Sequence, residues 1–182
     1  KEGETIVDLC AAPGGKTTHI AEILHNTGEV LAYDIHEQKL ELIKENCQWL
    51  VLTNVKLNQM DATKLSADLI NKADKILIDV PCSGIGIIRK KPEIKYNKKR
   101  KDLKDMVEVQ REIMKNAWEY LRQGGIMVYS TCTLNKEENE ENVKWFTEKY
   151  KDAEIERIFV GRGKEFKYDK EGMLTILPNE YM

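Results

Sequence analysis

Long apolar runs, a signal peptide and closely spaced cysteines are all missing from this chain. Without a run of about 18 apolar residues, no segment is expected to span a membrane. The four cysteines, Cys10, Cys47, Cys82 and Cys132, lie far apart, so they lack the paired spacing of a zinc knuckle. A chain of 182 residues is also too large to depend on disulfides. We therefore expect reduced thiols, no bound metal and a cytoplasmic protein.

An overall excess of positive charge is also missing, because the net charge is −2. This excludes a protein that binds nucleic acid over its whole surface. The charge is nevertheless segregated, since basic residues gather from Arg89 to Lys104 and acidic residues from Glu137 to Glu148. The basic stretch is either a binding segment or a solvated charged loop.

Strand-like and helix-like patterns alternate along the chain, which predicts an α/β fold with a mostly parallel sheet and helices on both faces. The predicted strands are 5–10, 29–33, 55–59, 76–80 and 126–129, and 155–160 and 174–177 form an antiparallel tail. The length suits one domain over residues 1–182. Because the chain starts at Lys1 rather than at a methionine, we expect a fragment of a longer protein.

Apolar residues at helical spacing predict the helices between these strands. The first begins at Thr17 or Thr18 and the second places Cys47 in the core, where free cysteines are common. The inner faces of these two helices are predicted to hold Ile20, Ile23, Leu24, Leu40, Ile43, Cys47 and Leu50. Further helices are predicted at 65–70, from Leu103 to a stop at Gly124 and Gly125, and from Glu137 to Tyr150.

The stretch from Ile76 to Gly84 places one carboxylate at the end of an otherwise apolar strand. Open α/β sheets bind their ligands at the carboxyl ends of the strands, where Asp79 is predicted to lie. Pro81 ends the strand, and Cys82 follows it directly. The alternative is a buried strand followed by an ordinary loop cysteine.

The turn from Cys10 to Lys16 is rich in glycine and alanine and precedes a helix, so a ligand can approach its backbone closely. A dinucleotide would need G-x-G-x-x-G, which is absent. A nucleoside triphosphate would need G-x-x-x-x-G-K-[ST], but its first glycine falls on Cys10. S-adenosylmethionine is the third candidate, because it needs a narrow turn and an acid for its ribose.

Three acids follow successive predicted strands, namely Asp34, Asp61 and Asp79. Asp34 stands where a ribose-binding acid is expected, and all three are predicted to line one crevice. Each of them is alternatively a turn or helix cap. Two thiols are placed in a similar way, because Cys82 and Cys132 follow the ends of predicted neighbouring strands. Their alternative role is that of small buried apolar side chains.

The strings VDLCAAPGGKT, DVPCSG and STCTLNKEENE together resemble the RNA cytosine-5 methyltransferase family, in particular its bacterial Sun or RsmB type that acts on 16S ribosomal RNA. The resemblance covers roughly residues 3–145, including the segment EVQREIMKNAWEYLRQGG. Thr133 stands where the family more often has serine, and Lys136 where it often has proline. Family members usually also carry an RNA-binding region before this domain and a final strand after it, and we expect both to lie outside this fragment.

The resemblance implies a Rossmann-like methyltransferase fold and transfer of a methyl group from S-adenosylmethionine to carbon 5 of a cytosine in RNA, with ribosomal RNA expected. The cofactor-binding residues it implies are Cys10, Ala11, Ala12, Pro13, Gly14, Gly15, Lys16, Asp34, Asp61 and Asp79. The nucleophile it implies is Cys132, and Cys82 is implied to help release the product. DNA methyltransferases instead use the thiol of a Pro-Cys motif, which would reverse the roles of the two cysteines.

Two further roles follow from this chemistry as hypotheses. Asp79 is predicted to hydrogen-bond the edge of the base while the thiolate attacks. The basic stretch from Arg89 to Lys104 is predicted to hold the RNA backbone, because it follows Cys82 and forms a long connection. Tyr96 within it either stacks on a base or packs against the protein.

Overall fold

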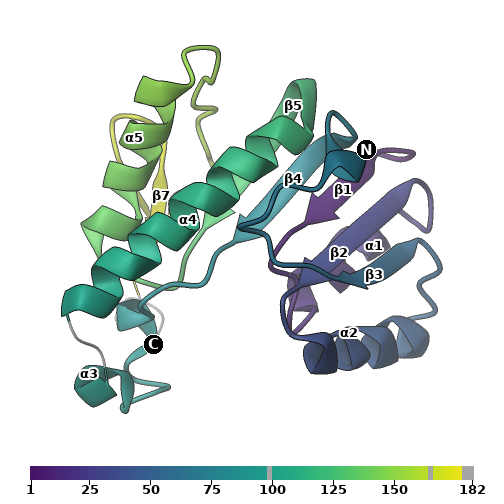
Figure 1. The fold of residues 1–182 in the computed structure, drawn as a ribbon, viewed down its shortest axis with the longest axis horizontal. Helices are drawn as coiled ribbons and strands as arrows, with labels where there is room; N and C mark the ends of the chain where they lie inside the picture. The colour runs from purple at the N-terminus through teal and green to yellow at the C-terminus, as the bar shows by residue number, and fades with distance from the viewer. Residues whose placement is uncertain (98–99, 164–165, 178–182) are drawn as a thin grey trace. The chain divides into compact units, whose positions relative to one another are not determined.

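The structure is a computed structural model, and it describes residues 1–97, 100–163 and 166–177 (Figure 1). The chain forms two compact units, Lys1–Pro81 with Val109–Ser130, and Cys82–Glu108 with Thr131–Met182. Each unit is described by itself. That residues 1–182 act as one catalytic domain remains a prediction.

The first unit is built on a sheet of five parallel strands in the order β3-β2-β1-β4-β5. The strands are β1 (Thr5–Asp8), β2 (Glu29–Asp34), β3 (Val55–Gln59), β4 (Ala73–Asp79) and β5 (Leu121–Ser130). The predicted α/β fold and the pairing of β4 with β5 are confirmed. In β4, Ile76, Leu77 and Ile78 are all buried, as expected for a strand covered on both faces.

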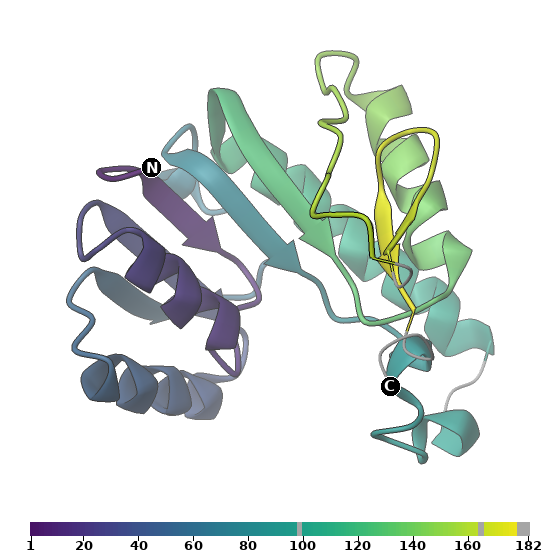
Figure 2. The same ribbon diagram turned by 180° about the vertical axis from the view of Figure 1, so that it is seen from behind.

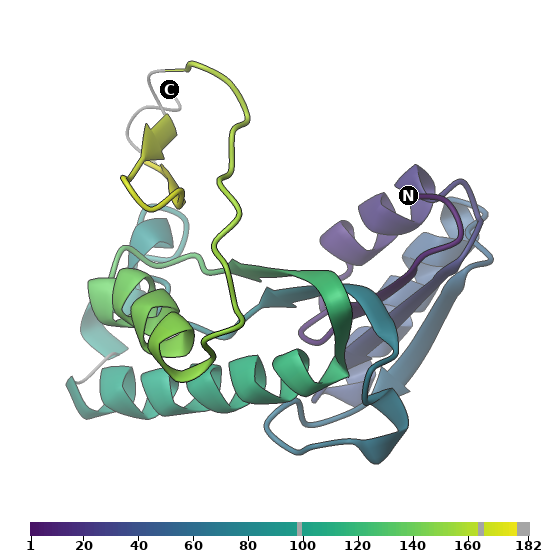
Figure 3. The same cartoon turned by 90° about the horizontal axis from the view of Figure 1, so that it is seen from above.

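Helices cover both faces of this sheet. They are α1 (Gly15–Ile23), α2 (Glu37–Trp49) and the C-terminal half of α4 (Arg100–Tyr120), with the short η1 (Ala67–Leu69) before β4. Figures 1 and 2 show α1 on one face and this half of α4 on the other, and Figure 3 shows the two faces from above. No helix in the described ranges is both long enough and apolar enough to cross a membrane.

The core confirms Cys47 as a buried residue, packed with Ile43 and Leu40. Two predicted inner positions are wrong, because Ile23 is 57% exposed and Leu50 is 46% exposed. In α1 the core is reached by Ala21, and Leu24 follows the last helical residue. Ile23 and Leu50 thus each lie at the end of a helix, where helical spacing no longer decides which side chains are buried.

The end of α4 also differs from the prediction. The helix ends at Tyr120 rather than at Gly124 and Gly125, which lie within β5 beside an irregularity in its pairing with β4. The hydroxyl of Tyr120 accepts a hydrogen bond from the Ser66 backbone N–H at 2.8 Å and donates one to the Lys64 carbonyl at 3.3 Å. The helix therefore ends where Leu121 begins to pair with Ala73 of β4, before the two glycines are reached.

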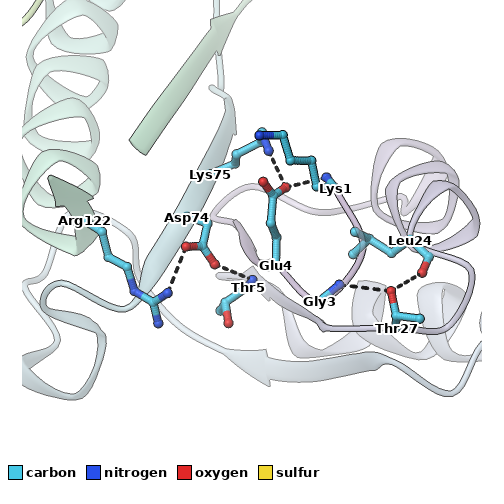
Figure 4. A network of polar contacts seen from close by, with 9 residues as sticks. All are labelled: Lys1, Gly3, Glu4, Thr5, Leu24, Thr27, Asp74, Lys75 and Arg122. Carbon is cyan, nitrogen blue, oxygen red and sulfur yellow. Dashed lines mark hydrogen bonds and ion pairs between the residues drawn. The ribbon is translucent and has the colours of Figure 1, made fainter. Parts of the chain in front are cut away.

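The amino ends of β1, β4 and β5 are joined by polar contacts (Figure 4). The Asp74 carboxylate accepts hydrogen bonds from the Thr5 backbone N–H at 2.7 Å and from the Arg122 guanidinium at 2.8 Å. Lys75 forms an ion pair with Glu4 beside them. These contacts hold the end of the sheet that lies away from the candidate site.

The second unit consists of short elements. They are η2 (Ile85–Ile87), α3 (Ile94–Asn97), the N-terminal part of α4, η3 (Lys136–Glu138), α5 (Glu140–Lys149), β6 (Phe166–Tyr168) and β7 (Leu174–Ile176). The predicted antiparallel tail is present as the pair β6–β7. The strand predicted at 155–160 is wrong, because that segment is not a strand and its Phe159 is 69% exposed. Its apolar residues therefore do not pair into a sheet.

Candidate active site

The turn between β1 and α1 forms a pocket of about 200 Å³. The described residues that line it are Asp8, Cys10, Ala11, Ala12, Pro13, Gly14, Gly15, Lys16 and Asp79. Gly14 has φ +105°, and a Cβ there would lie 2.9 Å from Ile43 Cγ1 of α2. Only glycine fits this conformation and this space, so the turn that sequence reasoning singled out has a backbone reason for its composition.

Asp79 lies at the carboxyl end of β4, as predicted, and its carboxylate has two partners. Lys16 Nζ lies 2.5 Å from Oδ2, and the Ser130 hydroxyl donates to Oδ1 at 2.6 Å. These contacts join the turn, β4 and β5 at the pocket. Lys16 thereby holds its ammonium group beside the one predicted acid that lines the pocket.

The other two predicted acids have different surroundings. Asp34 is buried and accepts hydrogen bonds from the backbone N–H groups of Ala12 at 3.1 Å and His36 at 2.9 Å. It therefore contacts the turn without lining this pocket. Asp61 accepts two hydrogen bonds from Thr63, and these bonds lower the pKa of its carboxyl group. Asp61 thus caps a turn, and its part in cofactor binding remains a prediction, as does that of Asp34.

Asp8 lines the pocket and was missed by the sequence reasoning, although it is the single acid in an apolar strand. It is 1% exposed, and its Oδ2 accepts a hydrogen bond from the Thr17 hydroxyl at 2.7 Å. Burial raises the pKa of Asp8 to about 6, against the opposing effect of the Thr17 hydrogen bond. The pocket is therefore lined by a buried carboxyl group whose ionisation is energetically unfavourable.

The pH dependence of stability should reveal Asp8. Because its pKa is raised on folding, its protonated form stabilises the fold below pH 4, and this stabilisation is lost as the pH rises through about 6. Asp8→Asn, which cannot ionise, should therefore remove about 2 kcal/mol of the fall in unfolding free energy between pH 4 and pH 8. Denaturant unfolding at several pH values measures this. The exposed Asp68→Asn is the matched control, and equal pH profiles for Asp8→Asn and the unchanged protein would contradict the assignment.

The two thiols of the second unit are in contact. Cys82 Sγ and Cys132 Sγ lie 3.1 Å apart, and the Cys132 backbone N–H donates to Cys82 Sγ at 3.3 Å. Cys132 is exposed and Cys82 half-buried. The hydrogen bond to Cys132 and, next, burial raise the pKa of Cys82 well above its ordinary range. Both effects favour the protonated form of Cys82.

Gly86 brings the two thiol-bearing segments together and was not predicted as a site residue. Its backbone N–H donates to the Cys132 carbonyl at 3.2 Å, and a Cβ at Gly86 would lie only 2.8 Å from that oxygen. The signal available in the sequence is the second glycine that follows Cys82, in Gly84-Ile85-Gly86. Glycine is therefore needed here for a close backbone approach beside Cys132.

Cys10 and the basic stretch are the other parts of the chain for which the sequence predicted a role. Cys10 lines the turn pocket, and burial raises the pKa of its thiol to about 12, which makes it a poor nucleophile. Lys90, Lys91 and Tyr96 are exposed, whereas Lys98 and Lys99 lie outside the described residues. Among the described residues, no group of three or more His, Cys, Asp or Glu side chains could hold a metal ion.

The chain is similar to known proteins over most or all of its length. A family model described as "16S rRNA methyltransferase RsmB/F" matches residues 1–182. The chain is 41% identical to a probable ribosomal RNA small subunit methyltransferase B of Bacillus subtilis, over 100% of this chain and 41% of that protein. It is 47% identical to a tRNA (cytosine(72)-C(5))-methyltransferase of Pyrococcus horikoshii, over 88% of this chain and 40% of that protein.

A solved structure is similar to this chain in both fold and sequence. The crystal structure of NSun6 from Pyrococcus horikoshii with SFG, an analogue of S-adenosylmethionine, has a TM-score of 0.71 and 38% identity, over 93% of this chain and 39% of that chain. The fold is the Rossmann-like fold of S-adenosylmethionine-dependent methyltransferases. The chain belongs to the RsmB/F family of 16S ribosomal RNA methyltransferases. It spans about two fifths of the length of the curated relatives named above.

Proposed function

We propose that this chain transfers a methyl group from S-adenosylmethionine to carbon 5 of a cytosine in RNA, through a covalent bond between Cys132 and the base. Ribosomal RNA is the proposed substrate, because the family model and the Bacillus subtilis relative both carry that name. The observation that carries the proposal is the contact between the Cys82 and Cys132 sulfurs. Two thiols in contact fit a reaction that needs one to attack and one to assist.

The turn pocket supports the cofactor assignment. Gly14, with its positive φ, keeps the turn narrow, and the start of α1 favours the negative charge of a ligand carboxylate. Cys10 to Lys16 and Asp79 would hold the cofactor, and Asp34 and Asp61 are proposed to assist. Its volume of about 200 Å³ is below the ~300–1,000 Å³ of typical small-molecule sites, so this pocket would cover part of the cofactor. When bound, the cofactor supplies an electrophilic methyl group on a sulfonium.

Cys132 supplies the covalent step. Its thiolate forms a bond to carbon 6 of the cytosine, and the electron pair of the ring double bond moves to carbon 5, which becomes nucleophilic. After methylation a proton must leave carbon 5, and the sulfur–carbon bond breaks as the double bond is restored. The exposed position of Cys132 suits a group that must reach a base. The base itself must be unpaired or flipped out of a helix.

Cys82 assists the same reaction. Its raised pKa favours the protonated thiol, and we propose that this thiol donates a hydrogen bond to the Cys132 sulfur and so favours the thiolate that attacks. Once that sulfur is bonded to the base, the Cys82 thiol is proposed to release its own proton to solvent, and the resulting thiolate takes the proton from carbon 5. Asp79 is proposed to hydrogen-bond the edge of the base, and the segment from Arg89 to Lys104 to hold the RNA backbone. We further propose that the chain acts in the cytoplasm, within a longer protein that has an RNA-binding region before it.

Trapping with RNA that contains 5-fluorocytosine tests the proposal, because fluorine at carbon 5 prevents the final elimination. The unchanged chain with S-adenosylmethionine is expected to form an adduct that survives denaturing electrophoresis. Cys132→Ala should form none, whereas Cys82→Ala should still form it. If Cys82→Ala abolishes the adduct and Cys132→Ala keeps it, the roles are reversed. Absence of any adduct with the unchanged chain would contradict the proposed function.

A further inference from the structure

Two consecutive residues, Glu138 and Asn139, lie where η3 ends and α5 begins. From sequence alone they belong to an acidic run that suits the start of a helix, where negative charge is favourable. The structure separates Glu138 from that run, because its side chain is 0% exposed. The neighbouring acids Glu137, Glu140 and Glu141 are all exposed. A carboxyl group is costly to bury, so its contacts should explain its position.

The contacts of Glu138 lead to both cysteines. Its Oε2 accepts a hydrogen bond at 2.8 Å from the backbone N–H of Ser83, the residue after Cys82. Its Oε1 accepts one at 3.1 Å from the Asn135 side chain. The Ser83 hydroxyl in turn lies 2.7 Å from the hydroxyl of Thr133, the residue after Cys132. The buried carboxyl group thus fixes the Cys82 segment, which is tied to the Cys132 segment.

The contacts of Asn139 hold the Cys132 segment on both sides of the cysteine. Its Oδ1 accepts a hydrogen bond from the Thr131 hydroxyl at 2.6 Å, and its Nδ2 donates to the Thr133 carbonyl at 3.0 Å. Asn139 itself has φ −117° and ψ −97°, outside helical geometry, which separates η3 from α5. Two adjacent side chains therefore contact both segments that carry the thiols.

We infer that Glu138 and Asn139 are positioning residues that keep the Cys82 and Cys132 sulfurs at their 3.1 Å separation. Their role in methyl transfer rests on the proposed function, whereas their control of the thiol pair does not. Neither residue touches a reacting atom in this role. A displacement of about 1 Å at a reacting group can cost on the order of 10²-fold in rate, so the precision of this segment matters to the chemistry.

The test is bridging of the two thiols by dibromobimane, followed by peptide mapping of the bridged pair. Glu138→Gln cannot accept both hydrogen bonds, since its amide nitrogen would face an N–H group. Asn139→Asp loses the donor to the Thr133 carbonyl. Each variant should bridge Cys82 to Cys132 at least about tenfold more slowly than the unchanged chain. Glu137→Gln, which makes the same chemical change at an exposed neighbour, is the matched control and should bridge at the original rate.

The bridging rate is measured well below the melting temperature of each variant, so that a loss of stability alone does not change it. Unchanged bridging in both variants would overturn the inference, as would 5-fluorocytosine adduct formation at the original rate. If bridging slows in the variants but the unchanged chain forms no RNA adduct, the positioning role stands and the proposed function fails. Different results would therefore contradict the positioning role and the proposed function.

Discussion

Cys82→Ala is expected to remain covalently joined to RNA that contains ordinary cytosine in place of 5-fluorocytosine, in the presence of S-adenosylmethionine. In the proposed reaction Cys132 leaves the base only after the proton at carbon 5 is removed, and the variant lacks the thiol 3.1 Å away that assists this step. Loss of a general base typically costs about 10²–10⁴-fold in rate. Multiple-turnover methylation should fall by that amount, while the first methyl group is still transferred. Denaturing electrophoresis of labelled RNA measures the adduct.

Two comparisons make this prediction specific. Cys82→Ala with Cys132→Ala in one chain should form no adduct, because the attacking sulfur is gone. Cys47→Ala, a change in the core of the first unit, should turn over without accumulating adduct. Normal turnover by Cys82→Ala would show that another group removes the proton and that the contact between the sulfurs has no part in release.

Gly86→Ala is expected to slow the attack of Cys132 on the base by a factor of similar size. The new Cβ would lie 2.8 Å from the Cys132 carbonyl oxygen, a distance that backbone atoms cannot tolerate, so the Cys132 segment must move. A shift of about 1 Å at a reacting group costs on the order of 10²-fold, and the rate of 5-fluorocytosine adduct formation should fall by at least that factor. Overpacking should also lower the unfolding free energy by about 1–3 kcal/mol.

The two effects of Gly86→Ala are measured separately. Single-turnover adduct formation at low temperature reports the position of Cys132, and thermal unfolding reports the packing. A lower melting temperature with an unchanged rate of adduct formation would show that the close approach of Gly86 serves stability alone. Cys132→Ala in the same background distinguishes a slow adduct from a non-specific one.

Much of the first unit could be predicted from the sequence because its signals are local. A strand such as β4 is a short apolar run, and the turn after β1 combines glycine with a following helix, so neither needs knowledge of distant residues. The alternation of such elements then implies a parallel sheet, which places Asp79 and the β5 end side by side. The contact of Cys82 with Cys132 follows the same logic, since each lies within three residues of the end of one of two neighbouring strands.

The residues that escaped prediction depend on contacts between segments distant in sequence. Glu138 is one of several acids at a predicted helix start, and its burial is understood only once its hydrogen bond with the backbone N–H of Ser83 is known. Asp8 reads as a strand residue until Thr17 and the pocket are placed beside it. The end of α4 at Tyr120 depends on the pairing of the next residue, Leu121, with Ala73 of β4. In each case a contact with another segment of the chain decides the outcome, and the periodicity of the sequence does not reveal that contact.

The short distance between the Cys82 and Cys132 sulfurs also governs how the protein must be handled. Peroxide converts an exposed thiol to a sulfenic acid, which condenses with an adjacent thiol to a disulfide and releases water. Air-exposed preparations should therefore lose both sulfhydryls together, and a dithiol reductant should restore them. Activity assays compared across laboratories need the same reducing conditions, because oxidised and substituted chains would otherwise look alike.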